Sequence, residues 1–165
     1  MILNKRQVII MQGLSGSGKT SWVGKYHPDA TVVSADSYFT RSGKYEFDPK
    51  QLGRAHARCL SRFIRALDRG DTTIVVDNTN AEKWEWCNYT KLATHWGYKW
   101  SVVDMMQDPK LGLFWLADMP ESKVAKAFQN KVLAERNVHG VSAEAIAKQR
   151  ERYTHARPEE LYSEV

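Results

Sequence analysis

Short apolar runs alternate along this chain with longer segments in which apolar residues recur every three or four positions. The short runs predict buried strands at about residues 7–12, 31–35, 72–77 and 99–105. The longer segments predict helices from Gly18 to before His27, and at about 49–69, 81–96, 120–137 and 143–153. Because strands that alternate with helices are typical of a parallel sheet, we expect an α/β fold of three layers, with helices on both faces.

Residues with known capping preferences mark several helix ends. Gly70 follows the second predicted helix, Asn80 is the candidate N-cap of the third, and Gly97 is placed to terminate it. The stretch 105–118 fits neither pattern. Within it, Leu113-Phe114-Trp115-Leu116 is compatible with a fifth strand or with a buried loop.

The first predicted strand leads into Gly13-Leu14-Ser15-Gly16-Ser17-Gly18-Lys19-Thr20, which fits G-x-x-x-x-G-K-[ST] at every fixed position. Such a loop turns successive backbone N–H groups toward a phosphate, so Gly13, Ser15, Gly16, Ser17 and Gly18 are candidate phosphate contacts. Lys19 would reach the β- and γ-phosphates, Thr20 would offer its hydroxyl to Mg²⁺, and the helix start would add positive charge. A plain Gly/Ser turn is the alternative, but the flanking strand and helix favour a site for ATP or another nucleoside triphosphate.

Two carboxylates stand where a parallel sheet presents its chemistry, at the carboxyl ends of strands. Asp36 follows Val32-Val33-Ser34-Ala35, and Asp77 follows Ile74-Val75-Val76. Phosphoryl transfer uses one group to accept the proton of the attacking hydroxyl and another to hold Mg²⁺. Each residue also has a structural reading, a helix cap for Asp36 and a local hydrogen bond for Asp77. Because both carboxylates are expected beside the phosphate loop, we expect Asp36 to act as the base and Asp77, with Thr20, to bind the metal.

Length and composition indicate one soluble domain over residues 1–165, with 42% hydrophobic and 26% charged residues. No apolar stretch approaches a membrane span, and the N-terminus runs directly into the first strand, so we expect a cytoplasmic protein. Cys59 and Cys87 lie in predicted helices without metal-ligand spacing, which predicts reduced core thiols and no structural metal. The net charge of +5 modestly favours a polyanionic partner.

Five arginines share one face of the second predicted helix: Arg54, Arg58, Arg62, Arg65 and Arg69, here called the arginine row. The opposite face carries the residues expected to pack on the sheet: Leu52, Cys59, Leu60, Phe63 and Leu67. A solvated charged face is the commoner explanation of such a row. With only Asp68 among the five arginines, the alternative is a surface for a nucleic-acid backbone.

Aromatic residues gather in the segment after Asp36, where an acceptor would approach. We expect one of Tyr38, Phe39, Tyr45 and Phe47 to stack on an acceptor base, and Arg41 is a candidate contact for an acceptor phosphate. Most of the six tryptophans are expected in the core. Trp84 and Trp86 are two positions apart on a helix, so one of them should be exposed.

Three stretches behind the phosphate loop carry a family resemblance: Ser34-Ala35-Asp36, Val75-Val76-Asp77-Asn78-Thr79-Asn80 and Glu135-Arg136-Asn137. In this order they resemble the P-loop polynucleotide 5′-hydroxyl kinases, most closely the branch related to the kinase-like domain of cyclic-nucleotide phosphodiesterase. Residues 43–49, Ala55-His56 and 137–142 are similar to recurring stretches of that branch. The resemblance covers about residues 7–153.

The resemblance implies an adenylate-kinase-like core with a helical lid at about 120–153. It implies Asp36 as general base, Lys19 and Thr20 on the triphosphate and metal, and Arg136 as the catalytic arginine of the lid. Candidate acceptor contacts are Asp36, Tyr38, Arg41 and Asn80. Where related kinases tend to carry a second lid arginine, this chain has Val138-His139-Gly140. A charged His139 would replace part of the positive charge with which that second arginine holds the phosphates.

We therefore expect an ATP-dependent kinase that phosphorylates the 5′-hydroxyl end of RNA or DNA with Mg²⁺. A small-molecule kinase for a nucleoside, sugar or antibiotic is the alternative, and it would not need the arginine row. A nucleotide-dependent binding module is the third class. A GTPase switch is disfavoured, because Asn130-Lys131-Val132-Leu133 lacks the aspartate of the guanine-reading N-K-x-D motif.

Overall fold

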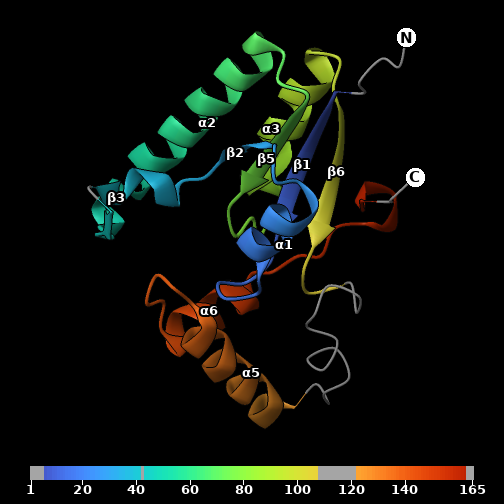
Figure 1. Ribbon diagram of the computed structural model, residues 1–165. Helices are drawn as coiled ribbons and strands as arrows, with labels where there is room; N and C mark the ends of the chain where they lie inside the picture. Colours follow the sequence, from blue (N-terminus) through green and yellow to red (C-terminus); the bar gives the residue numbers. More distant parts are fainter. Residues whose placement is uncertain (1–5, 42, 108–121, 163–165) are drawn as a thin grey trace.

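The fold of this chain is built on a sheet of four parallel strands, seen in a computed structural model that describes residues 6–41, 43–107 and 122–162 (Figure 1). The strands are β1 (Gln7–Gln12), β2 (Thr31–Val33), β5 (Thr73–Asp77) and β6 (Lys99–Asp104), and their order across the sheet is β2-β5-β1-β6. All four predicted strands are confirmed. β2 is shorter than expected, because Asp36 already lies in a turn of 3₁₀ helix, η1 (Asp36–Tyr38).

The helices follow the predicted order along the chain. They are α1 (Lys19–Tyr26), α2 (Leu52–Arg69), α3 (Lys83–His95), α5 (Lys123–Arg136) and α6 (Ala143–Glu151). Shorter elements are the 3₁₀ turns η2 (Pro49–Gln51) and η4 (Pro158–Glu160) and an antiparallel hairpin of β3 (Thr40–Arg41) and β4 (Lys44–Tyr45). The sequence pattern did not predict this hairpin, because two-residue strands are too short to show a period.

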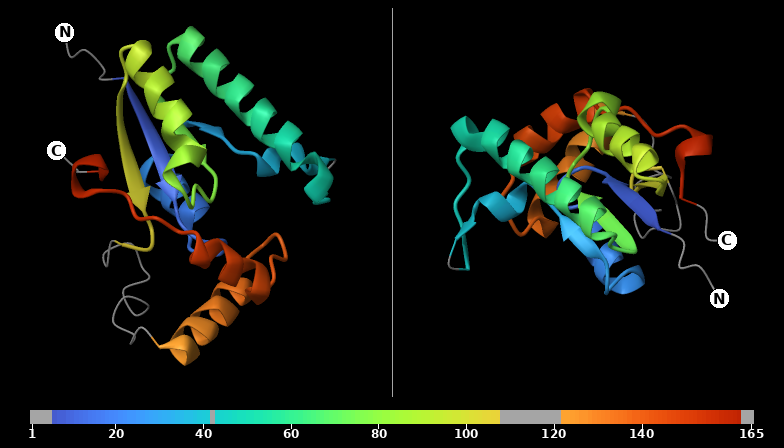
Figure 2. Two further views of the ribbon diagram at one scale, coloured as in Figure 1. Left: turned by 180° about the vertical axis from the view of Figure 1, so that it is seen from behind. Right: turned by 90° about the horizontal axis from the view of Figure 1, so that it is seen from above.

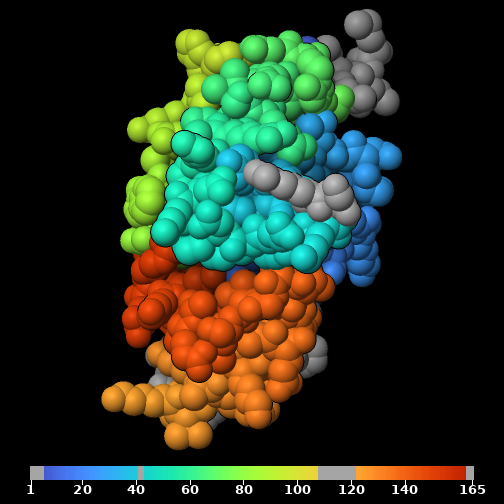
Figure 3. Space-filling model, turned by 90° about the vertical axis from the view of Figure 1, so that its left-hand side faces the viewer, coloured from blue at the N-terminus to red at the C-terminus, as the bar shows by residue number. Residues whose placement is uncertain are grey.

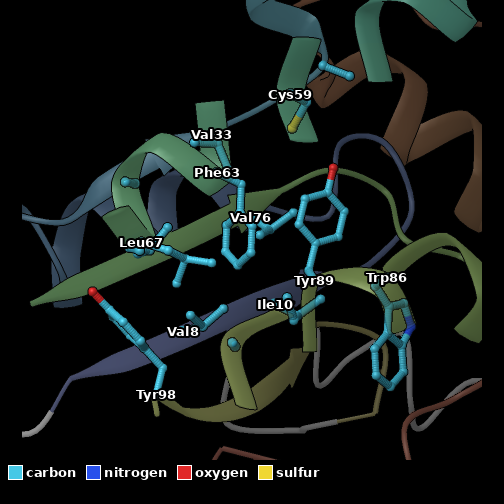
Figure 4. Close-up of a cluster of buried hydrophobic side chains, with 14 of the residues drawn as sticks. Val8, Ile10, Val33, Cys59, Phe63, Leu67, Val76, Trp86, Tyr89 and Tyr98 are labelled. Atoms are coloured by element: carbon cyan, nitrogen blue, oxygen red, sulfur yellow. The ribbon is translucent and has the colours of Figure 1, made fainter. Parts of the chain in front are cut away.

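Helices cover both faces of the sheet, which confirms the three-layer α/β fold (Figures 1 and 2). Successive residues of a strand point to opposite faces. Val8 and Ile10 therefore lie in one cluster with residues of α2 and α3, such as Phe63 and Trp86, as Figure 4 shows. On the other face, Ile9 and Met11 pack with Trp22 and Val23 of α1. Strand β1 is therefore buried on both of its faces and packs against both layers of helices.

Helices α5 and α6 form a helical hairpin next to the carboxyl ends of the strands (Figure 1). Part of its contact with the sheet is apolar, since Leu14 of the phosphate loop packs with Leu133 of α5 and Ile146 of α6. Ser122 and Ser142 cap the two helices by accepting hydrogen bonds from Ala125 and Ala145. The α5–α6 hairpin occupies the segment that the sequence predicted as the lid.

Two local predictions are wrong. Asn80 does not cap α3: Glu82 does, in a reciprocal capping box with Glu85, while Asn80 has a positive φ of 49°. Leu52 does not pack on the sheet: it is 40% exposed, because it opens α2 at the end that lies beside β3, beyond the strands (Figure 1). The other predicted core positions of α2 are buried or half-buried.

Some expectations concern residues outside the described part of the chain. The possible strand at residues 113–116 and the predicted helix start at Pro120 fall in 108–121, and α5 is described from Lys123.

Both cysteines are free thiols, Cys59 buried and Cys87 partly exposed. Trp86 is buried and Trp84 is 66% exposed, as the spacing predicted. Among the described helices, none has the length and apolar character needed to cross a bilayer.

Candidate active site

The phosphate loop joins β1 to α1 in a backbone conformation that requires glycine. Gly16 and Gly18 have φ angles of +80° and +94°, in the left-handed region that side chains disfavour. A Cβ at Gly16 would lie 2.1 Å from the carbonyl oxygen of Leu133 in α5. The loop is thus pressed against the α5–α6 hairpin, and only glycine allows this approach.

Lys19 lies folded over the loop. Its Nζ donates hydrogen bonds to the carbonyl oxygens of Gly13 (2.9 Å) and Leu14 (3.1 Å). Burial lowers the pKa of Lys19 to about 8, against the opposing charges of Asp77 and Asp36. Ser17 Oγ is buried and has no hydrogen-bond partner among the described residues. A cation and a buried hydroxyl at the start of a helix fit a phosphate group, so these residues could hold a nucleoside triphosphate.

Thr20 and Asp77 meet at the side of the loop. Thr20 Oγ1 donates a hydrogen bond of 2.7 Å to Asp77 Oδ2. Burial raises the pKa of Asp77, whereas the Thr20 hydrogen bond and the charge of Lys19 act in the opposite direction. A hydroxyl and a carboxylate are oxygen ligands of the kind that Mg²⁺ prefers, so this pair could hold the metal of a Mg·ATP complex.

Asp36 stands at the first position of η1, and its side chain is 50% exposed. Its Oδ1 accepts a hydrogen bond of 3.2 Å from the hydroxyl of Tyr45, and its Oδ2 lies 3.8 Å from Nε2 of His139. The charge of Asp36 raises the pKa of Asp77, so the two carboxylates share one electrostatic environment with Lys19. An accessible carboxylate whose charge acts on Lys19 of the phosphate loop is placed to accept a proton from a bound hydroxyl.

Two asparagines after Asp77 tie strand ends together. Asn78 Oδ1 accepts a hydrogen bond of 2.8 Å from the Ala35 backbone, and this contact fixes the chain just before Asp36. Asn80 is buried, and its Nδ2 donates to the Met11 carbonyl oxygen at 2.7 Å. The side chain of Asn80, predicted as an acceptor contact, is thus engaged within the sheet edge.

The other residues predicted to contact the acceptor substrate lie around η1 and the β3–β4 hairpin. Tyr38 is half-buried, and its hydroxyl donates to Gln51 Oε1 at 2.8 Å. Phe39 is buried and Phe47 is exposed. The side chain of Arg41 lies outside the described part of the structure.

Arg136 ends α5 and reaches the phosphate loop. Its Nη2 lies 4.0 Å from the position that a Cβ would take at Gly18, the residue before α1. Arg136 is exposed, so its guanidinium is available to an anion at the loop. The structure therefore brings Lys19, Thr20, Asp77, Asp36 and Arg136 to one edge of the sheet.

Two further polar groups at this edge were not singled out from the sequence. Gln149 of α6 accepts a hydrogen bond from the Ser15 backbone and donates one to Ser15 Oγ, both at 3.0 Å. Asp104 is buried and bonded to the Tyr153 hydroxyl (2.7 Å) and to His155 Nδ1 (2.8 Å). The rule that found Asp36 and Asp77 also applies to Asp104, since it ends the apolar strand β6.

The chain is similar to known proteins along most of its length. A family described as an AAA domain, AAA_33, matches residues 8–156. The chain belongs to this family. NEDD4-binding protein 2 of Homo sapiens is 33% identical over 149 residues, which are 88% of this chain and 8% of that protein. Heterogeneous nuclear ribonucleoprotein U-like protein 2 of Mus musculus is 32% identical over 87 residues, 45% of this chain and 12% of the relative. This AAA-family chain therefore spans a small part of both relatives.

Solved structures share the fold of this AAA-family chain. A chain of the Pnkp1/Rnl/Hen1 RNA repair complex matches 90% of it at 14% identity with a TM-score of 0.58, over 44% of that chain. A gluconokinase from Sinorhizobium meliloti 1021 matches 94% of it at 16% identity with a TM-score of 0.51, over 80% of that chain. The resemblance to P-loop kinases stated from the sequence is thus confirmed in the fold.

Proposed function

We propose that this protein is an ATP-dependent polynucleotide 5′-hydroxyl kinase, which transfers the γ-phosphate of ATP to the 5′ end of RNA or DNA in the cytoplasm. The observation that carries the proposal is the position of Asp36. Its carboxylate lies beside the phosphate loop on one side, and on the other η1 contacts the arginine row through a hydrogen bond of 2.7 Å from Arg62 Nη1 to Ser37 Oγ. A base next to both a donor site and a basic surface suits a polyanionic acceptor.

In the proposed reaction, the acceptor 5′-oxygen forms a bond to the γ-phosphorus while the bond from that phosphorus to the β–γ bridging oxygen breaks. Asp36 accepts the hydroxyl proton, and ADP leaves with the bridging oxygen. Mg²⁺, held by Thr20 and Asp77, would neutralise charge on the phosphates. Lys19 and Arg136 supply positive charge around the transferring group, and Arg136 brings it from the α5–α6 hairpin, which acts as the lid.

The arginine row supports a polynucleotide acceptor. Arg54, Arg58 and Arg65 are exposed on α2, and Arg62 is half-buried against Ser37. Within the described residues, none of these four forms an ion pair with an acidic side chain, whereas Arg69 is paired with Asp71 at 2.6 Å. Four arginines without acidic partners leave their positive charge available to phosphates, and Arg62 in the middle of the row contacts η1, which carries the proposed base.

A labelling experiment tests the reaction directly. The protein is incubated with γ-labelled ATP, Mg²⁺ and separate acceptors: 5′-hydroxyl RNA and DNA oligonucleotides, the same oligonucleotides with a 5′-phosphate, nucleosides, and sugars. We expect label on the 5′-hydroxyl oligonucleotides alone. Label on a nucleoside or sugar assigns a small-molecule kinase, and nucleotide binding with no labelled acceptor assigns a binding module; either result overturns the proposal.

A salt titration tests the arginine row separately from catalysis. Binding of a 5′-hydroxyl oligonucleotide is measured from low to high salt for wild type, Arg58→Ala/Arg62→Ala and Arg54→Ala/Arg58→Ala; the last leaves the Ser37 contact intact. Each lost phosphate contact should reduce the slope of log K against log salt by about 0.7 for a single strand. Lys91→Ala, an exposed cation on α3, is the matched control. Equal slopes in all four proteins would assign the row to a solvated face.

A further inference from the structure

His139 lies in the loop between α5 and α6, which is held in a fixed shape. Asn137 Oδ1 accepts hydrogen bonds from the backbone of His139 (2.8 Å) and of Val141 (3.2 Å). This pattern is a local side-chain turn that holds the loop as α5 ends. The position of the imidazole is therefore tied to the position of the α5–α6 hairpin.

The imidazole reaches across to the acceptor side of the site. Its ring lies 4.2 Å from the Tyr45 ring, centroid to centroid, at an angle of 35°. Figure 3 shows the segment of the α5–α6 hairpin next to the segment that holds the β3–β4 hairpin. Two parts of the chain almost a hundred residues apart thus meet through two rings.

Both rings also face the same carboxylate. The Tyr45 hydroxyl donates to Asp36 Oδ1, and His139 Nε2 lies 3.8 Å from Asp36 Oδ2. The contact between His139 and Tyr45 limits where the Tyr45 hydroxyl can lie, and that hydroxyl orients the carboxylate. Asp36 accordingly has the Tyr45 hydroxyl at one carboxylate oxygen and the His139 imidazole near the other only while the α5–α6 hairpin is in place.

We propose that His139 is a positioning residue that couples the nucleotide-binding lid to the acceptor base. This inference rests on the proposed function. A donor that contacts both the phosphate loop and Arg136 stabilises the docked position of the α5–α6 hairpin seen in this structure, and so keeps His139 against Tyr45 and Asp36 oriented for the acceptor hydroxyl. Because coupling between two sites is reciprocal, donor and acceptor bind cooperatively, and both effects pass through His139.

The first test measures that coupling by calorimetry. A 5′-hydroxyl oligonucleotide is titrated into the protein with and without Mg²⁺ and the non-hydrolysable ATP analogue AMP-PNP. We expect the analogue to tighten oligonucleotide binding about 5-fold or more in wild type, and the factor to fall to about 1 in His139→Ala. His139→Phe keeps a ring against Tyr45 and should retain part of the coupling. Val138 is 87% exposed, so Val138→Ala is the control and should keep all of the coupling. Full coupling in His139→Ala overturns the proposal.

The second test needs no acceptor, so it separates this inference from the proposed function. Amide hydrogen exchange of the β3–β4 hairpin is followed in wild type and His139→Ala, with and without Mg²⁺ and AMP-PNP. We expect the analogue to slow exchange around Tyr45 in wild type and to leave it unchanged in His139→Ala, although both proteins bind the analogue. If the two proteins respond alike, His139 carries no signal between the sites, whichever acceptor the labelling experiment identifies.

Discussion

The hydroxyl of Thr20 donates a hydrogen bond of 2.7 Å to the carboxylate of Asp77 and so joins the start of α1 to the end of β5. Two oxygen groups from different elements thereby converge at the side of the phosphate loop. We predict that Asp77→Asn raises the Mg²⁺ concentration needed for half-maximal activity, because an amide is a weaker ligand than a carboxylate. Magnesium titrations at saturating ATP measure this. An unchanged requirement would leave Asp77 with only its structural hydrogen bond to Thr20.

Asp36→Asn is expected to show the opposite pattern. Removal of a general base costs about 100-fold or more in turnover, while Mg·ATP affinity should stay near that of wild type. Single-turnover kinetics and nucleotide binding, measured on the same preparation, separate the two effects. If Asp36→Asn loses Mg·ATP affinity and keeps its acceptor rate, the roles of Asp36 and Asp77 are reversed.

Nucleotide binding should take up a proton at alkaline pH. Burial lowers the pKa of Lys19 to about 8 in the free protein, so its amine is largely neutral at pH 9. A triphosphate favours the charged ammonium and raises this pKa again. Affinity should therefore fall as the pH rises above 8. Calorimetry at pH 9 in two buffers of different ionisation enthalpy measures the proton uptake.

The variant Lys19→Ala tests this role of Lys19 by two measurements, turnover and proton uptake. Lys19→Ala should abolish turnover with the fold intact, since it removes positive charge from the transferring phosphoryl group, and it should also remove the proton uptake. Turnover at the wild-type rate in a folded Lys19→Ala protein would exclude Lys19 from the donor site. Proton uptake that persists in this variant would assign the titration to another group.

Arg136→Ala should lower turnover strongly at an unchanged melting temperature. Its guanidinium lies near Gly18, at the start of α1, and is exposed, so its loss removes charge from the site without opening the core. Lys131→Ala, an exposed cation of the same helix, is the matched control and should keep wild-type turnover. An exposed ion pair would contribute only about 0–1 kcal/mol to stability and nothing to catalysis. Wild-type turnover in Arg136→Ala would assign it to that role.

The contact between His155 and Asp104 should stabilise the fold most at low pH. The hydrogen bond to Asp104 raises the pKa of His155 above its unfolded value, burial opposes this, and the Asp104 charge adds to it. For a raised pKa, the contribution is fully present below the unfolded pKa of about 6.5 and is lost as the pH rises through the folded value. Melting temperatures of wild type and His155→Gln should therefore differ more at pH 6 than at pH 9. An equal difference at both values would show that the charge of His155 contributes nothing.

The phosphate loop and the strand ends could be predicted from the sequence because their signals are local. Glycine spacing, a lysine and a hydroxyl within eight residues specify the loop at Gly13–Thr20, and an apolar run of strand length specifies where Asp36 and Asp77 emerge. Parallel strands carry their carboxyl ends to one edge, so the alternating order of strands and helices places these residues on the same edge of the sheet. The family match and the kinase folds confirm that order.

Contacts between distant segments could not be predicted in this way, since they depend on how helices and hairpins pack. Asn80 looked like a helix cap in sequence, yet its amide joins β5 to β1 and Glu82 caps α3. The two-residue strands of the β3–β4 hairpin have no period, so nothing in the sequence placed the Tyr45 hydroxyl on Asp36.

The sequence by itself determined the fold class, the phosphate loop and the carboxylates at the strand ends, because each rests on spacing within one element or on the order of elements. Only the tertiary structure decided which groups surround those carboxylates. His139 is about a hundred residues from Asp36 along the chain, and it reaches that carboxylate because Leu14 packs on Leu133 and Ile146 and so docks the α5–α6 hairpin on the loop. Packing of apolar side chains carries no residue-specific signal in a single sequence, so the partners it brings together become visible only in the folded chain.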